Sequence, residues 1–489
     1  MPDATVCVSY RVLLKKDERG SMNKKGRLVR RFAAVFLTGC ILSGCGNDTV
    51  TGITAADSQN TEAEILSWFS EESVSVEYEV PSARSYICVD QTGYLTEAEK
   101  RVFCMGVMEE KSFSVVSAES GETVYTGALI KSEQKTTDGE FIFQGDFSEL
   151  EIPGTYYITT EYLGRSYPFA IGDEVYDSGF EQALEELFQM DFIEDPMESC
   201  KVICTLLLAY EIYPQSFTEH SGEEEHKTVP HLLQDIRNAI EIMIACQNHM
   251  TGEVFEKPVE DLVADGGGDI DLTAMYSAMI AKFCFVYKEF DPIAATQYLA
   301  YADLGWQYLD KNQRLSEVET DILYYCATEL YRVTGKAKYK ESIQTELRKG
   351  LVEDQGDFPG AYFGNMTYLT TTRSVSLNEC TNIMNSMTAK ATKIASDSKD
   401  SPMYVRNPKD VQATMQDAMV LLFMIRCNDN YENNVLLQNQ LHFLNGMNEE
   451  NVSYFVNLGQ VTADESWNRT PYGISQMILL YSALAGVQS

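Results

Sequence analysis

The feature that most constrains this sequence is a change of pattern near residue 172. Before it, short runs of β-branched and aromatic residues are separated by Gly, Asp, Ser and Pro, and many of these runs alternate in polarity. Such runs are typical of short β-strands. After it, apolar residues recur at i, i+3, i+4 and i+7 almost to the end of the chain, which is typical of helices with a buried face. The sequence therefore predicts a small β-domain followed by a larger all-α domain.

The number and spacing of these segments favour particular architectures. Several short strands in fewer than a hundred residues favour an immunoglobulin-like sandwich. The strands are expected at residues 86–90, 101–105, 112–116, 140–143, 154–159 and 167–171. An even ring of about six helical hairpins would form an α/α barrel. A solenoid is the alternative, although the sequence has no repeat of fixed period. The helices are expected at residues 180–188, 197–213, 231–248, 272–290, 294–309, 317–334, 337–352, 377–396, 411–427, 435–445 and 471–484.

The N-terminal region has the pattern of an export signal. A basic stretch follows Met22, and the apolar run at residues 32–42 is too short for a good transmembrane helix. The next residues, Leu42-Ser43-Gly44-Cys45, resemble a bacterial lipobox, in which the cysteine becomes lipidated after cleavage. We therefore assign residues 1–45 to a leader and expect translation to start at Met22, with residues 1–21 upstream of the true start.

The leader predicts where the protein works. A lipid on Cys45 would hold it on the extracellular face of a bacterial membrane. An ordinary secretory signal, which would give a secreted protein, is the alternative. Residues 46–83 are polar and are expected to form a flexible tether.

Charge and cysteine content exclude some classes of function. The formal net charge is -35, which argues against nucleic acid as a partner, because phosphate binding needs clustered Lys and Arg. The nine cysteines beyond the leader show no CxxC pair and no Cys/His spacing of a metal site. Five of them lie among apolar residues at helical spacing and are expected to be buried free thiols: Cys204, Cys246, Cys284, Cys326 and Cys427.

Several strings carry a resemblance to a known family. In the β-part they are residues 90–95 (DQTGYL), 146–148 (DFS), 153–156 (PGTY) and 166–171 (SYPFAI). In the α-part they are residues 206–214, 229–233, 327–335 and 440–446. Together they resemble family 9 glycoside hydrolases of the cellulase type. The resemblance implies an immunoglobulin-like domain at residues 84–172 and an (α/α)6 barrel at residues 173–489.

The resemblance also implies a chemistry. Family members hydrolyse β-linked polysaccharides of the β-1,4-glucan class with inversion and without a cofactor. One carboxylic acid protonates the leaving oxygen and one carboxylate activates water. The implied partner of this chain is therefore a polysaccharide or oligosaccharide.

The catalytic strings of the family are not found in place. Its base lies in a DAGD motif, which does not occur in this sequence, and the barrel is shortened at that segment. Its acid glutamate would fall near Thr470 and Pro471. The nearest carboxylates, Asp464 and Glu465, are candidates for the acid, and Asp191 and Asp195 are candidates for a shifted base. Whether the chain is an active enzyme stays open, and a catalytically lost glycan-binding or envelope lipoprotein is the alternative.

Aromatic residues are candidates for substrate binding. Trp467 lies beside Asp464 and Glu465, and an indole ring stacks well on a pyranose face. Tyr362, Phe363 and Tyr368 lie in a Gly-rich segment, residues 356–369, that we expect to form a loop. Such a loop would line a glycan cleft, and packing at the end of the barrel is the alternative.

An acidic, Gly-rich segment at residues 265–271 contains ligand types that suit Ca²⁺. Its spacing is not that of an EF-hand. Capping of a helix that begins at Leu272 is the alternative.

Overall fold

The computed structural model describes residues 85–107, 109–190, 192–217, 229–262, 267–428, 430–457 and 469–485. The predicted leader and tether, with Cys45, lie outside the described residues. So do the candidate site residues Asp191, Asp464, Glu465 and Trp467.

The first domain is a sandwich of two antiparallel four-stranded sheets, as the strand pattern predicts. One sheet has the order β1-β2-β6-β5 and the other the order β4-β3-β7-β8. The bounds are β1 Ile87–Cys88, β2 Arg101–Gly106, β3 Ser112–Ser117, β4 Thr123–Ala128, β5 Ile130–Lys135, β6 Phe141–Asp146, β7 Gly154–Thr160 and β8 Phe169–Ile171. In the core of the sandwich the ring of Tyr94 meets Phe147 and Phe169 edge to face, with centroids 5.2 and 5.4 Å apart.

Within the described residues, the second domain contains twelve α-helices, of which eleven were expected. Their bounds are α4 Val175–Gln189, α5 Pro196–Ile212, α6 His231–Met243, α7 Ile270–Tyr287, α8 Pro292–Lys311, α9 Thr320–Thr334, α10 Ala337–Lys349, α11 Gly360–Thr370, α12 Leu377–Lys399, α13 Val411–Cys427, α14 Tyr431–Leu444 and α15 Pro471–Ala485. The exception is α11, which lies where a Gly-rich loop was expected, so that prediction is wrong.

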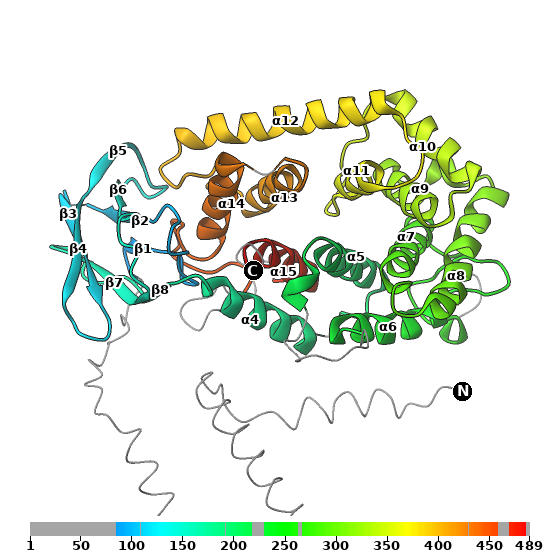
Figure 1. The fold of residues 1–489 in the computed structure, drawn as a ribbon, viewed down its shortest axis with the longest axis horizontal. Coiled ribbons are helices and arrows are strands. Elements are labelled where there is room, and N and C mark those ends of the chain that lie inside the picture. The colour runs from blue at the N-terminus through cyan, green and yellow to red at the C-terminus, as the bar shows by residue number, and fades with distance from the viewer. Residues whose placement is uncertain are drawn as a thin grey trace, which may run out of the picture. The chain divides into compact units, whose positions relative to one another are not determined.

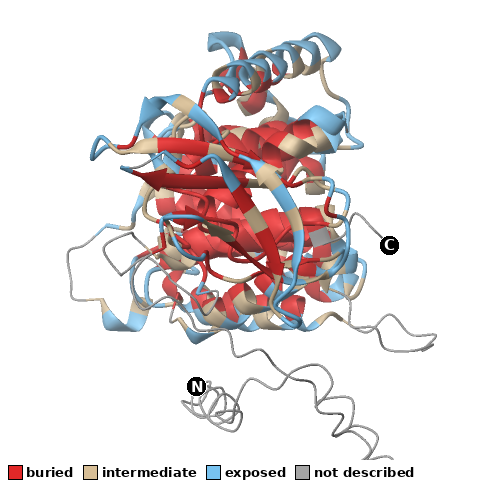
Figure 2. Ribbon diagram, turned by 90° about the vertical axis from the view of Figure 1, so that its left-hand side faces the viewer, coloured by how far each residue is buried: buried red, intermediate tan, exposed pale blue. Residues whose placement is uncertain are grey.

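The helices form a closed double ring (Figure 1). Helices α5, α7, α9, α11, α13 and α15 are buried over most of their length and make the inner ring, in which α15 packs on α5 and closes the circle. The helices between them bury one side and expose the other. Figure 2 shows this distribution, with red at the centre of the molecule and pale blue on its outer surface. The ring confirms the predicted α/α barrel and rules out the solenoid.

Inner helix α7 illustrates why the ring is stable. It is apolar almost all round, as a helix surrounded by protein must be. It is long and apolar enough to cross a membrane, but 83% of that window is buried inside the protein. Asp269 caps it by accepting from Leu272 N at 2.7 Å. This is the capping role that was the alternative to Ca²⁺ binding.

Cysteines follow the predicted burial with one exception. Cys204, Cys246, Cys284 and Cys326 are buried, and all nine described cysteines are free thiols. Cys427 is exposed, so its predicted burial is wrong. It is the last residue of α13, where the chain leaves the core.

The two domains are joined through the DQTGYL string. Asp90 accepts from Thr92 N and Gly93 N through Oδ1, which forms a tight turn. Its Oδ2 lies 2.7 Å from Nδ1 of His442 on α14, and both side chains are buried. At Gly446 (φ 134°) the chain passes so close to the β-domain that a Cβ would lie 2.8 Å from Val89 O. Residues 90–95 thus contribute to the contact between the two domains.

Candidate functional site

A cavity of about 430 Å³ lies where α11 and α13 begin, beside the outer helix α12. Its volume is within the range of small-molecule sites, about 300–1,000 Å³. Acidic residues of the segment before α11 form one side, and basic residues of α12 lie on another. The lining residues are Glu353, Asp354, Gly356, Asp357, Pro359, Tyr362, Lys390, Lys393, Ile394, Arg406, Gln412, Met415, Gln416, Asp417, Met419, Val420 and Gln476.

Asp354 is held at the N-terminal end of α11. Its Oδ1 accepts from the backbone N of Ala361 at 2.9 Å and of Tyr362 at 3.3 Å. Burial raises the pKa of this carboxyl to about 6, and the two N–H donors offset only part of that effect. Asp354 therefore keeps its proton in a substantial fraction of molecules near pH 6. A carboxyl with a raised pKa inside a cavity is typical of a general acid.

The opposite wall is held by charged contacts. Lys390 Nζ donates to the Tyr362 hydroxyl at 3.3 Å and lies 5.0 Å from its ring centroid. Arg406 binds both oxygens of Asp417, with distances of 2.9 and 2.5 Å. Asp417 is nearly fully buried. Such a bidentate pair fixes the guanidinium plane at the base of the wall.

Further carboxylates gather where the inner helices begin. Burial raises the pKa of Asp271, Glu319 and Asp321. Asp271 Oδ1 accepts from Glu319 N at 2.8 Å, which ties the beginning of α7 to that of α9. Asp321 Oδ2 accepts from Gln355 N at 3.0 Å, next to Asp354. This end of the ring is therefore acidic, and its acids hold their protons more tightly than exposed ones.

One of the predicted site residues, Asp195, lies at the start of α5. The connection from α4 runs only from Met190 to Asp195. Asp195 is exposed and caps α5, accepting from Met197 N at 2.8 Å and Glu198 N at 3.1 Å. Its carboxylate thus has a structural task, and its role as a base stays a prediction.

The start of α15 has no carboxylate in its first turn. Thr470 Oγ1 accepts from Gly473 N at 3.1 Å, and Glu198 of α5 accepts from Tyr472 N at 2.9 Å. Arg469 pairs with Glu186 of α4. Capping contacts thus occupy the start of α15 in the described part of the chain, and the expectation that the family's acid would fall near Thr470 and Pro471 stays a prediction.

The predicted aromatic residues divide into two groups. Tyr362 is partly exposed and lines the cavity. Phe363 is buried and packs on Phe358 and Tyr325, at centroid distances of 4.8 and 5.6 Å. Tyr368 is also buried, and its hydroxyl accepts from Ser376 N at 3.0 Å. Phe363 and Tyr368 therefore pack the barrel, and Tyr362 is the one of the three that borders the cavity.

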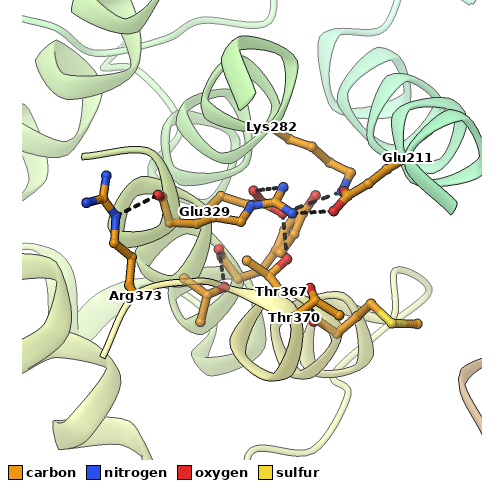
Figure 3. Close-up of polar contacts among 10 residues, drawn as sticks. Glu211, Lys282, Glu329, Thr367, Thr370 and Arg373 are labelled. Carbon is orange, nitrogen blue, oxygen red and sulfur yellow. Dashed lines mark hydrogen bonds and ion pairs between the residues drawn. The ribbon is translucent and has the colours of Figure 1, made fainter. Parts of the chain in front are cut away.

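A second polar cluster lies at the other end of the inner helices (Figure 3). Lys282 of α7 binds Glu211 of α5 at 2.7 Å and Glu329 of α9 at 3.6 Å. Arg332 of α9 binds the same two carboxylates, each at 2.5 Å. Thr367 of α11 donates to Glu329 at 2.7 Å. Because its charges are paired and mostly buried, we interpret this cluster as a structural network that holds the inner helices together.

The sequence analysis missed five polar residues that line the cavity, namely Asp354, Lys390, Arg406, Asp417 and Gln476. They come from four different segments, and no local motif marks them. The raised pKa of Asp354 depends on its burial in the folded protein, which cannot be read from the sequence. Within the described ranges, no group of three His, Cys, Asp or Glu residues could hold a metal ion.

The fold defines the class of proteins in which an immunoglobulin-like domain precedes an (α/α)6 barrel. A family model described as "Cellulase N-terminal ig-like domain" matches residues 82–165. Another, described as "Glycosyl hydrolase family 9", matches residues 196–476, more than half of the chain. The chain belongs to glycosyl hydrolase family 9.

Solved structures with a similar fold include three family 9 proteins. A metagenome-derived glycoside hydrolase family 9 endoglucanase has a TM-score of 0.69 and 19% identity. A GH9 protein of Bacteroides ovatus has a TM-score of 0.67 and 15% identity. AaCel9A in complex with cellobiose-like isofagomine has a TM-score of 0.68 and 18% identity. Each match covers 82% of this chain and 99% of the other. No curated protein matches the chain.

Proposed function

We propose that this protein acts on β-linked glucans of the β-1,4 class as an inverting O-glycosyl hydrolase. The observation that carries the proposal is Asp354, a carboxyl with a raised pKa inside a cavity at the end of the barrel where the inner helices begin. Membership of family 9 and the endoglucanase structures with the same fold support it.

The proposed chemistry assigns one acidic side chain of the cavity to each proton transfer. Asp354 protonates the glycosidic oxygen as the bond to the leaving sugar breaks. A second acidic side chain of the same cavity, Asp357 or Glu353, takes a proton from the water that attacks the anomeric carbon on the face opposite the leaving group. Tyr362 offers its ring as a platform for one pyranose. Asp464 and Glu465 are the rival candidates for the acid.

The test is the release of reducing ends from soluble β-1,4- and mixed-linkage glucans. Asp354→Asn should lower the rate by about 10²–10⁴-fold, the usual contribution of acid–base assistance. Asp291→Asn, at the N-cap of α8 outside the cavity, is the matched control, because Asn caps a helix as well as Asp does. It should leave the rate unchanged. A similar rate in Asp354→Asn, with a large loss in Glu465→Gln or Asp464→Asn, would move the acid to the rival position.

A second candidate is a non-catalytic glycan-binding protein. The short connection from Met190 to Asp195 favours it, because no segment there carries the family's base. In that case the wild type binds the same glucans in calorimetry but releases no reducing ends over a prolonged incubation.

We also propose that the protein is lipid-anchored at Cys45 on the outer face of a bacterial membrane. The lipobox-like string supports this proposal. Metabolic labelling with a fatty acid should mark the wild type and leave Cys45→Ala unlabelled. Equal labelling of both would contradict it.

A further inference from the structure

Gln476 differs from the other polar residues of the cavity. It lies on α15, the last inner helix, and reaches a cavity that is lined mainly by α11, α12, α13 and the segment before α11. The side chain is 6% exposed. Because it lines the cavity, its remaining exposed surface faces that space.

Three other polar residues of the cavity make hydrogen bonds within the protein. Asp417 binds Arg406 with both oxygens. Asp354 accepts two backbone N–H groups, and the hydroxyl of Tyr362 accepts from Lys390. No hydrogen bond joins the side-chain amide of Gln476 to a described residue, and its polar atoms are not among the fully buried unpaired ones, so solvent in the cavity reaches them. Buried polar groups in proteins are almost always hydrogen-bonded, since an unpaired one is costly. Water or a ligand that enters the cavity can therefore pair with the amide.

We propose that Gln476 is a ligand-contacting residue of the cavity and binds two adjacent hydroxyls of a pyranose ring. A carboxamide presents one acceptor and two donors side by side, and neighbouring sugar hydroxyls can supply both a donor and an acceptor. The buried side chains of Met415 and Val420 line the same space and offer apolar contact to the ring's C–H groups. This inference rests on the proposed function, because it takes the ligand to be a β-linked glucan.

The test is isothermal titration calorimetry of the full chain with cellopentaose. Gln476→Met keeps the volume of the side chain and removes the amide, and it should weaken binding about tenfold, the equivalent of about 1.4 kcal/mol. Gln476→Asn keeps the amide but withdraws it by one methylene, and it should weaken binding by a smaller factor. Gln438→Met, at a partly buried glutamine of α14 outside the cavity, is the matched control and should bind as the wild type does.

The outcomes separate this inference from the proposed function. Wild-type affinity in both Gln476 variants would overturn the inference and leave the proposed function standing. No binding by the wild type would overturn both. Weaker binding in Gln476→Asn, with a thermal midpoint equal to that of the wild type, supports the inference even where Gln476→Met fails to fold.

Discussion

Arg332 and Glu211, which are 121 residues apart in the sequence, lie 2.5 Å apart across the inner ring of the barrel. Lys282 binds the same glutamate, and both cations also bind Glu329. The network joins α5, α7 and α9 through ion pairs that are mostly buried. Water and salt screen such pairs less than they screen pairs on the surface. The network lies at the end of the inner helices opposite the cavity, and we expect it to stabilise the barrel.

Replacing Lys282 by Met should destabilise the protein strongly. The change leaves two glutamates with less positive charge around them, and breaking a buried pair on one side costs about 3–5 kcal/mol. Arg314→Ala, which breaks the exposed pair with Glu317, is the control and should change the free energy of unfolding little. Denaturant unfolding measures both. Equal losses of unfolding free energy in the two variants would contradict a strongly stabilising role of the buried network.

The two ends of the barrel should respond oppositely to pH. The pKa of Asp354 is raised to about 6, so the folded state keeps a proton that the unfolded chain releases near 3.8. Its contribution to stability therefore falls as pH rises through that window. Burial acts to raise the pKa of Glu211, but Lys282 and Arg332 outweigh it and lower the value to about 2. Glu211 contributes stability above its ordinary pKa of 4.5 that is lost as pH falls toward 2.

Asp354→Asn should stabilise the protein above pH 6 by about 1–2 kcal/mol. The shift of about two pKa units corresponds to about 3 kcal/mol at most, and partial exposure reduces it. The free energy of unfolding measured from pH 4 to pH 8 should therefore depend less on pH in the variant than in the wild type. A variant less stable than the wild type at pH 7 would mean that the carboxylate is stabilising as a cap.

Gly446→Ala should loosen the contact between the domains. The added Cβ would meet the Val89 carbonyl oxygen at 2.8 Å, and the backbone conformation is unfavourable for alanine. Gly164→Ala in the β-domain is the matched control, since φ is also positive there but the space is open. Both should lose about 1 kcal/mol from backbone strain. In thermal unfolding Gly446→Ala alone should lose more, and identical losses would contradict the close approach.

Substitutions of Tyr362 and Phe363 should affect different properties, the first glucan binding and the second stability. Tyr362→Ala should weaken glucan binding and change stability little, because its ring borders the cavity. Phe363→Ala should cost about 3–5 kcal/mol in stability, because its ring lies in the core. Calorimetric binding and thermal unfolding of the two variants check this. Unaltered binding in Tyr362→Ala would remove it from the site.

The sequence predicted the order of domains and most elements, because their periodicity is local. It missed α11, whose glycines, threonines and asparagine have low helix propensity. The helix forms there because Gly364 lets it approach α9 so closely that a Cβ would lie 2.5 Å from the ring of Tyr324. Strands β4 and β5 were missed because their side chains are mostly exposed and carry little alternation.

The candidate site was less predictable than the fold. Asp354 and Gln476 are 122 positions apart in the sequence (476 − 354) and meet only when the ring closes. Their chemistry depends on burial, which arises from packing of the whole barrel. The aromatic string at Tyr362 did point toward the cavity, and its neighbours Phe363 and Tyr368 point toward the core instead.

The most direct test of the central claim is ¹H NMR of cellopentaose during incubation with the wild-type protein. An inverting hydrolase acting on a β-linked glucan first releases products as the α-anomer, before mutarotation equilibrates them. We expect early α-anomer signals that are absent with Asp354→Asn. A spectrum without new anomeric signals, or one in which the β-anomer appears first, would contradict the account.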